Sequence, residues 1–181
     1  MNTTIKNGTV RGFNIGIFIG NTLGSISLVE EIRAEQNRFA GIEIAGRQTR
    51  ATIRNNHIVA TAGTSNATGI RVTTTGDLSS VRVINNDVID TSATNGRPIG
   101  IHVEGCCTVA EGNRIINNTP PNPRGSVGID MGRTSSSLVV NNRISFMTTG
   151  INAEGSTKIR DNLTVDVRFP FQGGIDAGNN N

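Results

Sequence analysis

The residues of this chain that could carry chemistry recur at one place in a repeat, directly after a Gly-Ile pair. The residues at this position are Phe18, Glu43, Arg71, His102, Asp130, Asn152 and Asp176. Two residues later, on the same side of an extended strand, comes a second outward row, to which Glu104 and Glu154 belong. Because strands stack about 4.8 Å apart, the two rows would form one charged surface.

Two kinds of chemistry suit this surface. A histidine or carboxylate can abstract a proton while an arginine neutralises an acidic sugar, as lyase or epimerase chemistry requires. Carboxylates two coils apart, Asp130 with Asp176 or Glu104 with Glu154, would instead lie about 9 to 10 Å apart, near the upper end for inverting glycosidases. The candidate catalytic residues are His102, Asp130, Arg71 and Glu104. The candidate substrate-binding residues are Glu43, Asn152, Glu154 and Asp176.

The same polarity also has a structural explanation. An outer sheet face is expected to be polar, and opposite charges on neighbouring strands stabilise pairing by a few tenths of a kcal/mol. Both explanations require the charged residues to lie on adjacent strands of one sheet.

The repeat that positions these residues is typical of a solenoid. The Gly-Ile pairs begin at positions 16, 41, 69, 100, 128, 150 and 174, and each opens an alternating run typical of a strand with one buried face. Between successive pairs, an asparagine occurs three residues after an apolar residue. These asparagines are Asn37, Asn56, Asn86, Asn113, Asn142 and Asn162. Near the start, Gly8 takes the same place, so we expect a sharp corner with positive φ at this position and a ladder of stacked side chains.

One coil is therefore a Gly-Ile strand, a second strand, the asparagine corner, a third short strand and a variable loop. The longest loops span 61–68, 91–98 and 117–127, and Phe169-Pro170-Phe171 is assigned to the last loop. The sequence predicts an all-β, single-stranded parallel β-helix of about seven coils, as one domain over residues 1–181 or as a piece of a longer protein. Neither end has an evident capping helix, so we expect self-association or further coils there.

Two sequence segments carry a family resemblance: Gly41-Ile42-Glu43-Ile44-Ala45-Gly46 and Ile53-Arg54-Asn55-Asn56-His57-Ile58. They are similar to the NosD-type degenerate repeats of the pectin-lyase-like right-handed parallel β-helix superfamily, over nearly the whole chain. The resemblance implies right-handed winding, a substrate cleft on the outer face of the Gly-Ile sheet, and a secreted or cell-surface location. It implies no single reaction, because the superfamily contains lyases, hydrolases, epimerases, phage tailspikes and non-catalytic modules.

Composition narrows the classes of function. A formal charge of +3, six Phe and no Trp or Tyr argue against a nucleic-acid partner. No apolar run approaches membrane-spanning length, and the start at Met1 is not a signal peptide. Cys106 and Cys107 are adjacent and lack partners at metal-ligand spacing, so we predict no disulfide, no metal site and no cofactor.

The leading prediction is a polysaccharide-associated domain that binds or processes an acidic glycan along the Gly-Ile face. The alternative is a non-enzymatic structural or interaction module, such as part of an adhesin, a phage fibre or an assembly scaffold. A third hypothesis is a periplasmic metal-handling accessory protein, and only the resemblance to NosD-type repeats suggests it. Whether the chain is an enzyme stays open at this stage.

Overall fold

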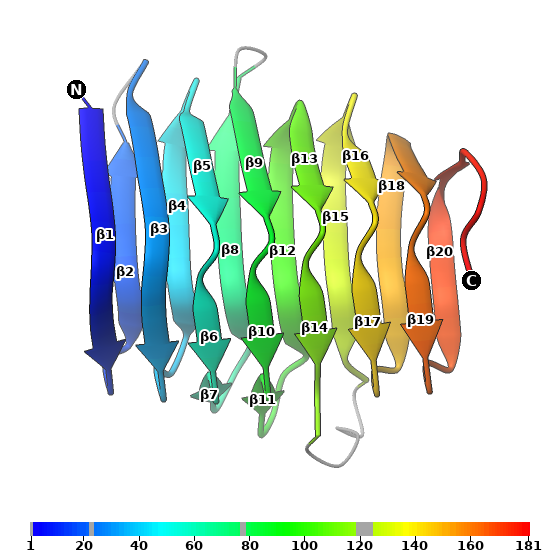
Figure 1. The fold of residues 1–181 in the computed structure, drawn as a ribbon, viewed down its shortest axis with the longest axis horizontal. Helices are drawn as coiled ribbons and strands as arrows, with labels where there is room; N and C mark the ends of the chain where they lie inside the picture. Colours follow the sequence, from blue (N-terminus) through cyan, green and yellow to red (C-terminus); the bar gives the residue numbers. More distant parts are fainter. Residues whose placement is uncertain (1, 22–23, 77–78, 119–124) are drawn as a thin grey trace.

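A computed structural model describes residues 2–21, 24–76, 79–118 and 125–181, which include only the two ends of the loop predicted at 117–127. These residues form strands stacked in parallel as a solenoid with three walls, and none of them is helical (Figure 1). The all-β parallel β-helix expected from the sequence is therefore confirmed.

The first wall contains the Gly-Ile strands, which pair in sequence order. Its strands are β2 (Ile15–Asn21), β4 (Ala40–Arg47), β8 (Ala67–Thr75), β12 (Pro98–Cys106), β15 (Val127–Ser135), β18 (Thr149–Arg160) and β20 (Phe169–Asp176).

The other two walls are continuous in the first coils and divided later. β1 (Asn2–Arg11) and β3 (Ile26–Glu35) each run through both walls. The second wall continues with β5 (Arg50–Arg54), β9 (Ser80–Ile84), β13 (Thr108–Glu111), β16 (Leu138–Val140) and the end of β18. The third wall continues with β6 (His57–Val59), β10 (Asp87–Ile89), β14 (Arg114–Ile116), β17 (Arg143–Ser145) and β19 (Leu163–Val165). The short strands β7 (Ala62–Gly63) and β11 (Ser92–Ala93) pair separately, within the variable loops.

The solenoid has about five complete turns, fewer than the seven coils counted from the Gly-Ile pairs. The first pair lies on β2, the end strand of the first wall, which pairs with β4 on one side only. The last pair, Gly174-Ile175, does not open a strand of the first wall at all. The predicted number of seven is therefore too high, because it counts the incomplete coils at the two ends.

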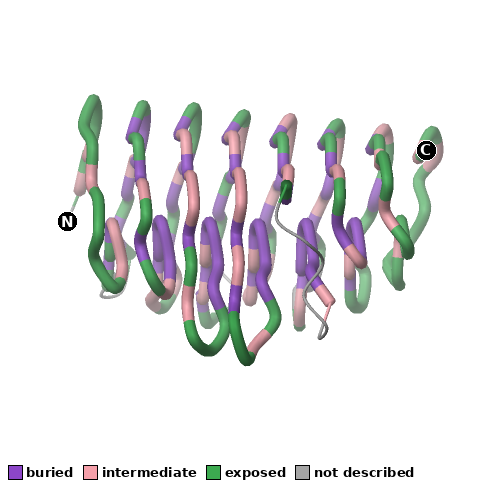
Figure 2. The backbone as a smooth tube through the Cα atoms, turned by 90° about the horizontal axis from the view of Figure 1, so that it is seen from below, coloured by how far each residue is buried: buried purple, intermediate pink, exposed green. Residues whose placement is uncertain are grey.

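The core is a stack of apolar side chains inside the three walls. Figure 2 shows that buried residues recur from coil to coil along the solenoid. The isoleucines of the pairs form one column: Ile17, Ile42, Ile70, Ile101, Ile129 and Ile151. The glycine before each isoleucine is required by close packing. A Cβ atom built at Gly100 would lie 2.7 Å from Gly128 O and 2.6 Å from Ile115 Cγ2. Each coil can therefore approach the next only where a side chain is absent.

An asparagine ladder runs along the corner between the second and third walls. Each side-chain nitrogen donates to the side-chain oxygen of the next coil, at 2.9 to 3.0 Å. The ladder residues are Asn56, Asn86, Asn113, Asn142, Asn162 and Asn180; the last of these was missed in the sequence. Positive φ occurs at the residue before each asparagine, for example Asn85 and Gly112, and not at the asparagine as predicted. The ladder oxygens also accept backbone N–H groups, so buried polar atoms at this corner are paired.

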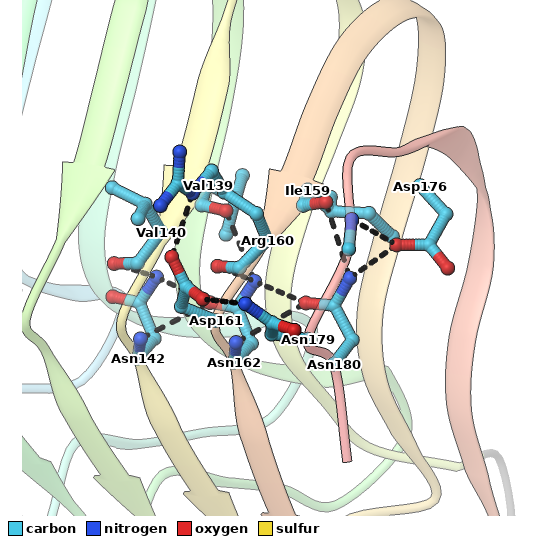
Figure 3. A network of polar contacts seen from close by, with 11 residues as sticks. Val139, Val140, Asn142, Ile159, Arg160, Asp161, Asn162, Asp176, Asn179 and Asn180 are labelled. Atoms are coloured by element: carbon cyan, nitrogen blue, oxygen red, sulfur yellow. Dashed lines mark hydrogen bonds and ion pairs between the residues drawn. The ribbon is translucent and has the colours of Figure 1, made fainter.

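The ladder ends at a carboxylate (Figure 3). Asn180 Nδ2 donates to Ile159 O at 3.1 Å and to Asp176 Oδ1 at 2.6 Å. The backbone N–H of Gly178 donates to the same carboxylate oxygen at 2.9 Å. Asp176 thus accepts the hydrogen bond that a further ladder oxygen accepts in the preceding coils.

The prediction that Asn37 belongs to this ladder is wrong. The ladder position of that coil is Ile32, whose backbone N–H donates to Asn56 Oδ1 at 3.0 Å. Gly8 pairs with Ile32 and so does lie at this corner, as predicted. Asn37 lies at the corner between the third and first walls, where its oxygen accepts the Phe13 N–H. The apolar-x-x-Asn pattern fits both corners, because each follows a residue with positive φ.

The placement of Asp176 in the outward row is also wrong. In β20 it is Gln172 that pairs with Asn152, and Phe171 that pairs with Ile151. Gly173 and Gly174 both have positive φ and turn the chain, so that Asp176 pairs with Ile159 in the second wall. Phe169-Pro170-Phe171 accordingly lies in a strand of the first wall and not in a loop.

Apart from Phe146, the exposed large apolar side chains of the described residues lie on the end coils. Phe13, Phe18 and Ile26 are at one end, and Leu163, Val165, Phe169 and Ile175 are at the other. Among the described strands, β2 and β20 at the two ends of the first wall each pair on one side only. Self-association through these coils stays a prediction. Among the described residues there is no helix of the length and apolarity needed to cross a membrane.

Candidate functional site

Strand pairing brings the residues that follow the Gly-Ile pairs into one outward row on the first wall. The row is Phe18, Glu43, Arg71, His102, Asp130, Asn152 and Gln172. Six of these residues were predicted from the sequence, and Gln172 replaces Asp176. Glu104 lies beside Thr73 and Gly132 in the second outward row.

A cleft of about 270 Å³ opens over β8, β12 and β15, and we call it the central cleft. It is lined by Phe39, Asn66, Thr68, Arg71, Arg97, Ile99, His102, Glu104 and Asp130. All four candidate catalytic residues therefore lie at one site. Of the candidate substrate-binding residues, Glu43 and Asn152 contact the lining residues, as described below.

Asp130 is the most highly connected carboxylate of the central cleft, and only 4% of it is exposed. Its Oδ2 lies 2.7 Å from Arg97 Nη2, and its Oδ1 accepts a hydrogen bond from Asn152 Nδ2 at 2.7 Å. Burial opposes ionisation of this carboxyl, but the His102 ring, the Asn152 amide and the Arg97 charge outweigh burial and lower its pKa. Asp130 is therefore ionised at neutral pH and is not a proton donor.

His102 lies between two carboxylates. Its Nδ1 is 3.4 Å from Asp130 Oδ2, in an orientation that makes no hydrogen bond, and its Nε2 is 3.4 Å from Glu104 Oε1. Asp130 is buried whereas the Glu104 side chain is 44% exposed. The His102 ring therefore has a buried carboxylate beside one nitrogen and a more exposed carboxylate beside the other.

A second ion pair supports the neighbouring coil. Arg71 Nη1 lies 2.5 Å from Glu43 Oε1, and the Arg71 guanidinium lies over the Phe39 ring, 5.4 Å from its centroid. The Glu43 side chain is 6% exposed and that of Arg71 28%. The carboxylate thus lies beneath the cation, and the cation faces the cleft.

Two candidate residues lie outside the central cleft. Glu154 is exposed, and its carboxylate accepts the backbone N–H of Arg133 at 3.2 Å. Asp176 ends the asparagine ladder, so the predicted carboxylate pair of Asp130 and Asp176 does not form on the first wall. An inverting-glycosidase arrangement of these two residues is therefore excluded.

Sequence reasoning missed Arg97 and Phe39. Arg97 lies in the loop predicted at 91–98, and Phe39 in the short connection before β4. The position of the longest loops beside the cluster was the available signal, because walls of a cleft come from such loops. The direction in which each loop folds over the sheet has no comparable signature in the sequence.

The described residues contain no group of three or more His, Cys, Asp and Glu side chains that could hold a metal ion. No family model, curated protein or solved structure matches this chain. Fold and site together define a parallel β-solenoid with a charged cleft on the outer face of its first wall.

The lowered pKa of Asp130 predicts a loss of stability in acid. Because its folded-state pKa lies below the ordinary value of 3.8, ionised Asp130 stabilises the folded protein fully above that value. This contribution is lost as the pH falls through the lowered pKa. We expect the difference in unfolding free energy between wild type and Asp130→Asn, measured by urea denaturation from about pH 7 to pH 3, to shrink in the acid range. A difference that is constant with pH would contradict the ionised state.

Proposed function

We propose that this protein is a right-handed β-helix of the pectin-lyase-like type and that it binds an acidic polysaccharide in the central cleft. The observation that carries the proposal is the layering of charge. The Arg71 and Arg97 side chains are 28% and 43% exposed, whereas the carboxylates that they pair with are each 6% exposed. An approaching ligand therefore meets guanidinium groups, which have unused donors for a sugar carboxylate.

The remaining lining residues suit a saccharide. Asn66 and Thr68 offer amide and hydroxyl groups of the kind that bind sugar hydroxyls, and Glu104 adds an acceptor. Ile99 provides an apolar surface on the floor. This combination of a few polar groups around apolar contact area is typical of ligand sites.

His102 gives the cleft a route to processing as well as binding. In this proposal its Nε2 takes the proton next to the carboxylate of a uronic acid, while Arg71 neutralises that carboxylate. The C–H electron pair forms a carbon–carbon double bond, and the glycosidic C–O bond breaks with its electron pair going to the oxygen. The leaving oxygen then takes a proton from water or from the imidazolium. Asp130 stabilises the imidazolium that results.

The two histidines of the chain allow a matched test. We expect His102→Ala to weaken the binding of oligogalacturonides by about tenfold, the effect of one lost hydrogen bond to a charged group. His57→Ala should have no effect, because His57 pairs with Asp87 on the third wall. Calorimetric titration measures the affinity, and absorbance of unsaturated uronides measures cleavage. Equal effects of both variants would show that the central cleft is not the site.

A broad glycan panel separates this proposal from its alternative. If wild type binds none of the acidic polysaccharides, the non-enzymatic structural module becomes the better reading of the fold. The ion pairs around Asp130 and Glu43 would then serve only to pair strands of the first wall.

A further inference from the structure

Among the described residues, two further hollows adjoin the central cleft. A hollow of about 640 Å³, the loop hollow, lies between the variable loops and the start of the Gly-Ile strands, and includes Arg38, Phe39, Asn66 and residues 62–65 and 92–94. A hollow of about 400 Å³, the far hollow, lies where β8 and β12 end, and includes residues 73–76, Glu104 and Arg133.

The three hollows are connected through shared residues. Phe39 and Asn66 line both the loop hollow and the central cleft, and Glu104 lines both the central cleft and the far hollow. Asn66 lies directly before β8, and Gly76 lies directly after it. The connected path therefore follows the strands, across the solenoid axis, over a strand length of roughly 30 Å at about 3.3 Å per residue.

Charge is distributed unevenly along this path. Arg71 and Arg97 of the central cleft are paired with Glu43 and Asp130. Arg38 in the loop hollow and Arg133 in the far hollow are exposed, and their guanidinium groups form no ion pair with any described residue. Each end of the path thus offers a guanidinium group that forms no ion pair with a described residue, and in the far hollow the carboxylates of Glu104 and Glu154 lie near Arg133.

We propose that a linear acidic oligosaccharide crosses the first wall along the strands, with anionic groups on Arg38 and Arg133 and its middle in the central cleft. This inference rests on the proposed function and adds the direction and charge pattern of the ligand. The polar lining of the loop hollow consists largely of hydroxyl and amide side chains, such as Asn14, Ser65 and Thr94. Phe39 is the one aromatic residue among the described residues that line the path, and its ring is covered by the Arg71 guanidinium, so no open ring is offered for stacking of nucleobases.

Oligogalacturonides of increasing length test the direction of the path. We expect affinity for wild type to rise with length until the oligomer reaches both arginines. Arg38→Ala and Arg133→Ala should each weaken binding of the long oligomer by about tenfold and leave a short oligomer unaffected. Arg143→Ala is the matched control, since it removes one exposed arginine from β17 on the third wall. Calorimetric titration of all four proteins with short and long oligomers gives the comparison.

The outcomes distinguish this inference from the proposed function. If long oligomers bind Arg38→Ala and Arg133→Ala as tightly as Arg143→Ala, while His102→Ala weakens binding, the path along the strands is wrong and the central cleft survives. A loss at Gln172→Ala with no loss at the arginines would indicate a path along the solenoid axis. Equal affinity for a single-stranded oligothymidylate would overturn the saccharide class. Failure of wild type to bind any oligouronide removes both proposals.

Discussion

Gly128→Ala is expected to destabilise the protein by about 3 kcal/mol, the upper part of the usual range for overpacking a core. A Cβ atom at this position would lie 2.6 Å from Gly150 O in the next coil and 2.6 Å from Ile144 Cγ2. The carbonyl belongs to the backbone of a paired strand and cannot move without disturbing the stack. The added methyl group therefore separates two coils or displaces a core isoleucine.

The same strand contains the control. Gly132 lies four residues further along β15, and a Cβ atom there would have His102 Cε1 at 3.9 Å as its nearest neighbour. Gly132→Ala should leave the urea midpoint almost unchanged or raise it slightly. Measuring both variants by urea denaturation compares one substitution at two positions. Similar midpoints would show that coil spacing does not depend on the glycines of the pairs.

Asn113→Ala is expected to cost about 3 to 4 kcal/mol, because it interrupts the ladder at its middle. Asn113 Nδ2 donates to Val83 O and to Asn142 Oδ1, both at 2.9 Å. Its oxygen accepts the backbone N–H and the side-chain nitrogen of Asn86, both at 3.0 Å. Alanine leaves these buried donors without that acceptor and leaves a cavity at a position that is 1% exposed.

The matched control for the ladder is Asn95→Ala. Asn95 is exposed in a loop, and its described hydrogen bond comes from the backbone N–H to Thr64 O. We expect a change within about 0.5 kcal/mol. Thermal or urea unfolding followed by circular dichroism measures both variants. A loss at Asn113 no greater than that at Asn95 would mean that the stacked amides contribute little beyond what water supplies to the unfolded chain.

The sequence predicted the repeating parts of the fold because each coil packs against its neighbours in the same way. Isoleucine after glycine and asparagine after a corner are nearly obligatory when coils stack, so their spacing was sufficient for Asn56 to Asn162. The errors concern coils that have a different residue at one of these positions. Ile32 takes the ladder position without a side-chain amide, and Phe171 replaces the isoleucine of the pair in β20. Register in such coils depends on pairing with the neighbour, which local patterns do not encode.

The candidate site was predictable to a similar extent. Alternation placed Arg71, His102 and Asp130 on one face, and stacking made them neighbours. Their ion pairs depend on side-chain length and on the partner offered by the next coil. Arg97 comes from a loop, where no period constrains its position. The face was therefore predictable, and the charge layering within it was not.

The amide side chains of the ladder also form a net dipole. Every amide in it points its oxygen toward the N-terminal coils and its nitrogen toward the C-terminal coils, so the group dipoles add along the stack. The positive pole of this column is Asn180, and it rests on the formally negative Asp176. The ladder thus reproduces the electrostatics of an anion at a helix N-terminus, with side-chain amides in place of peptide groups.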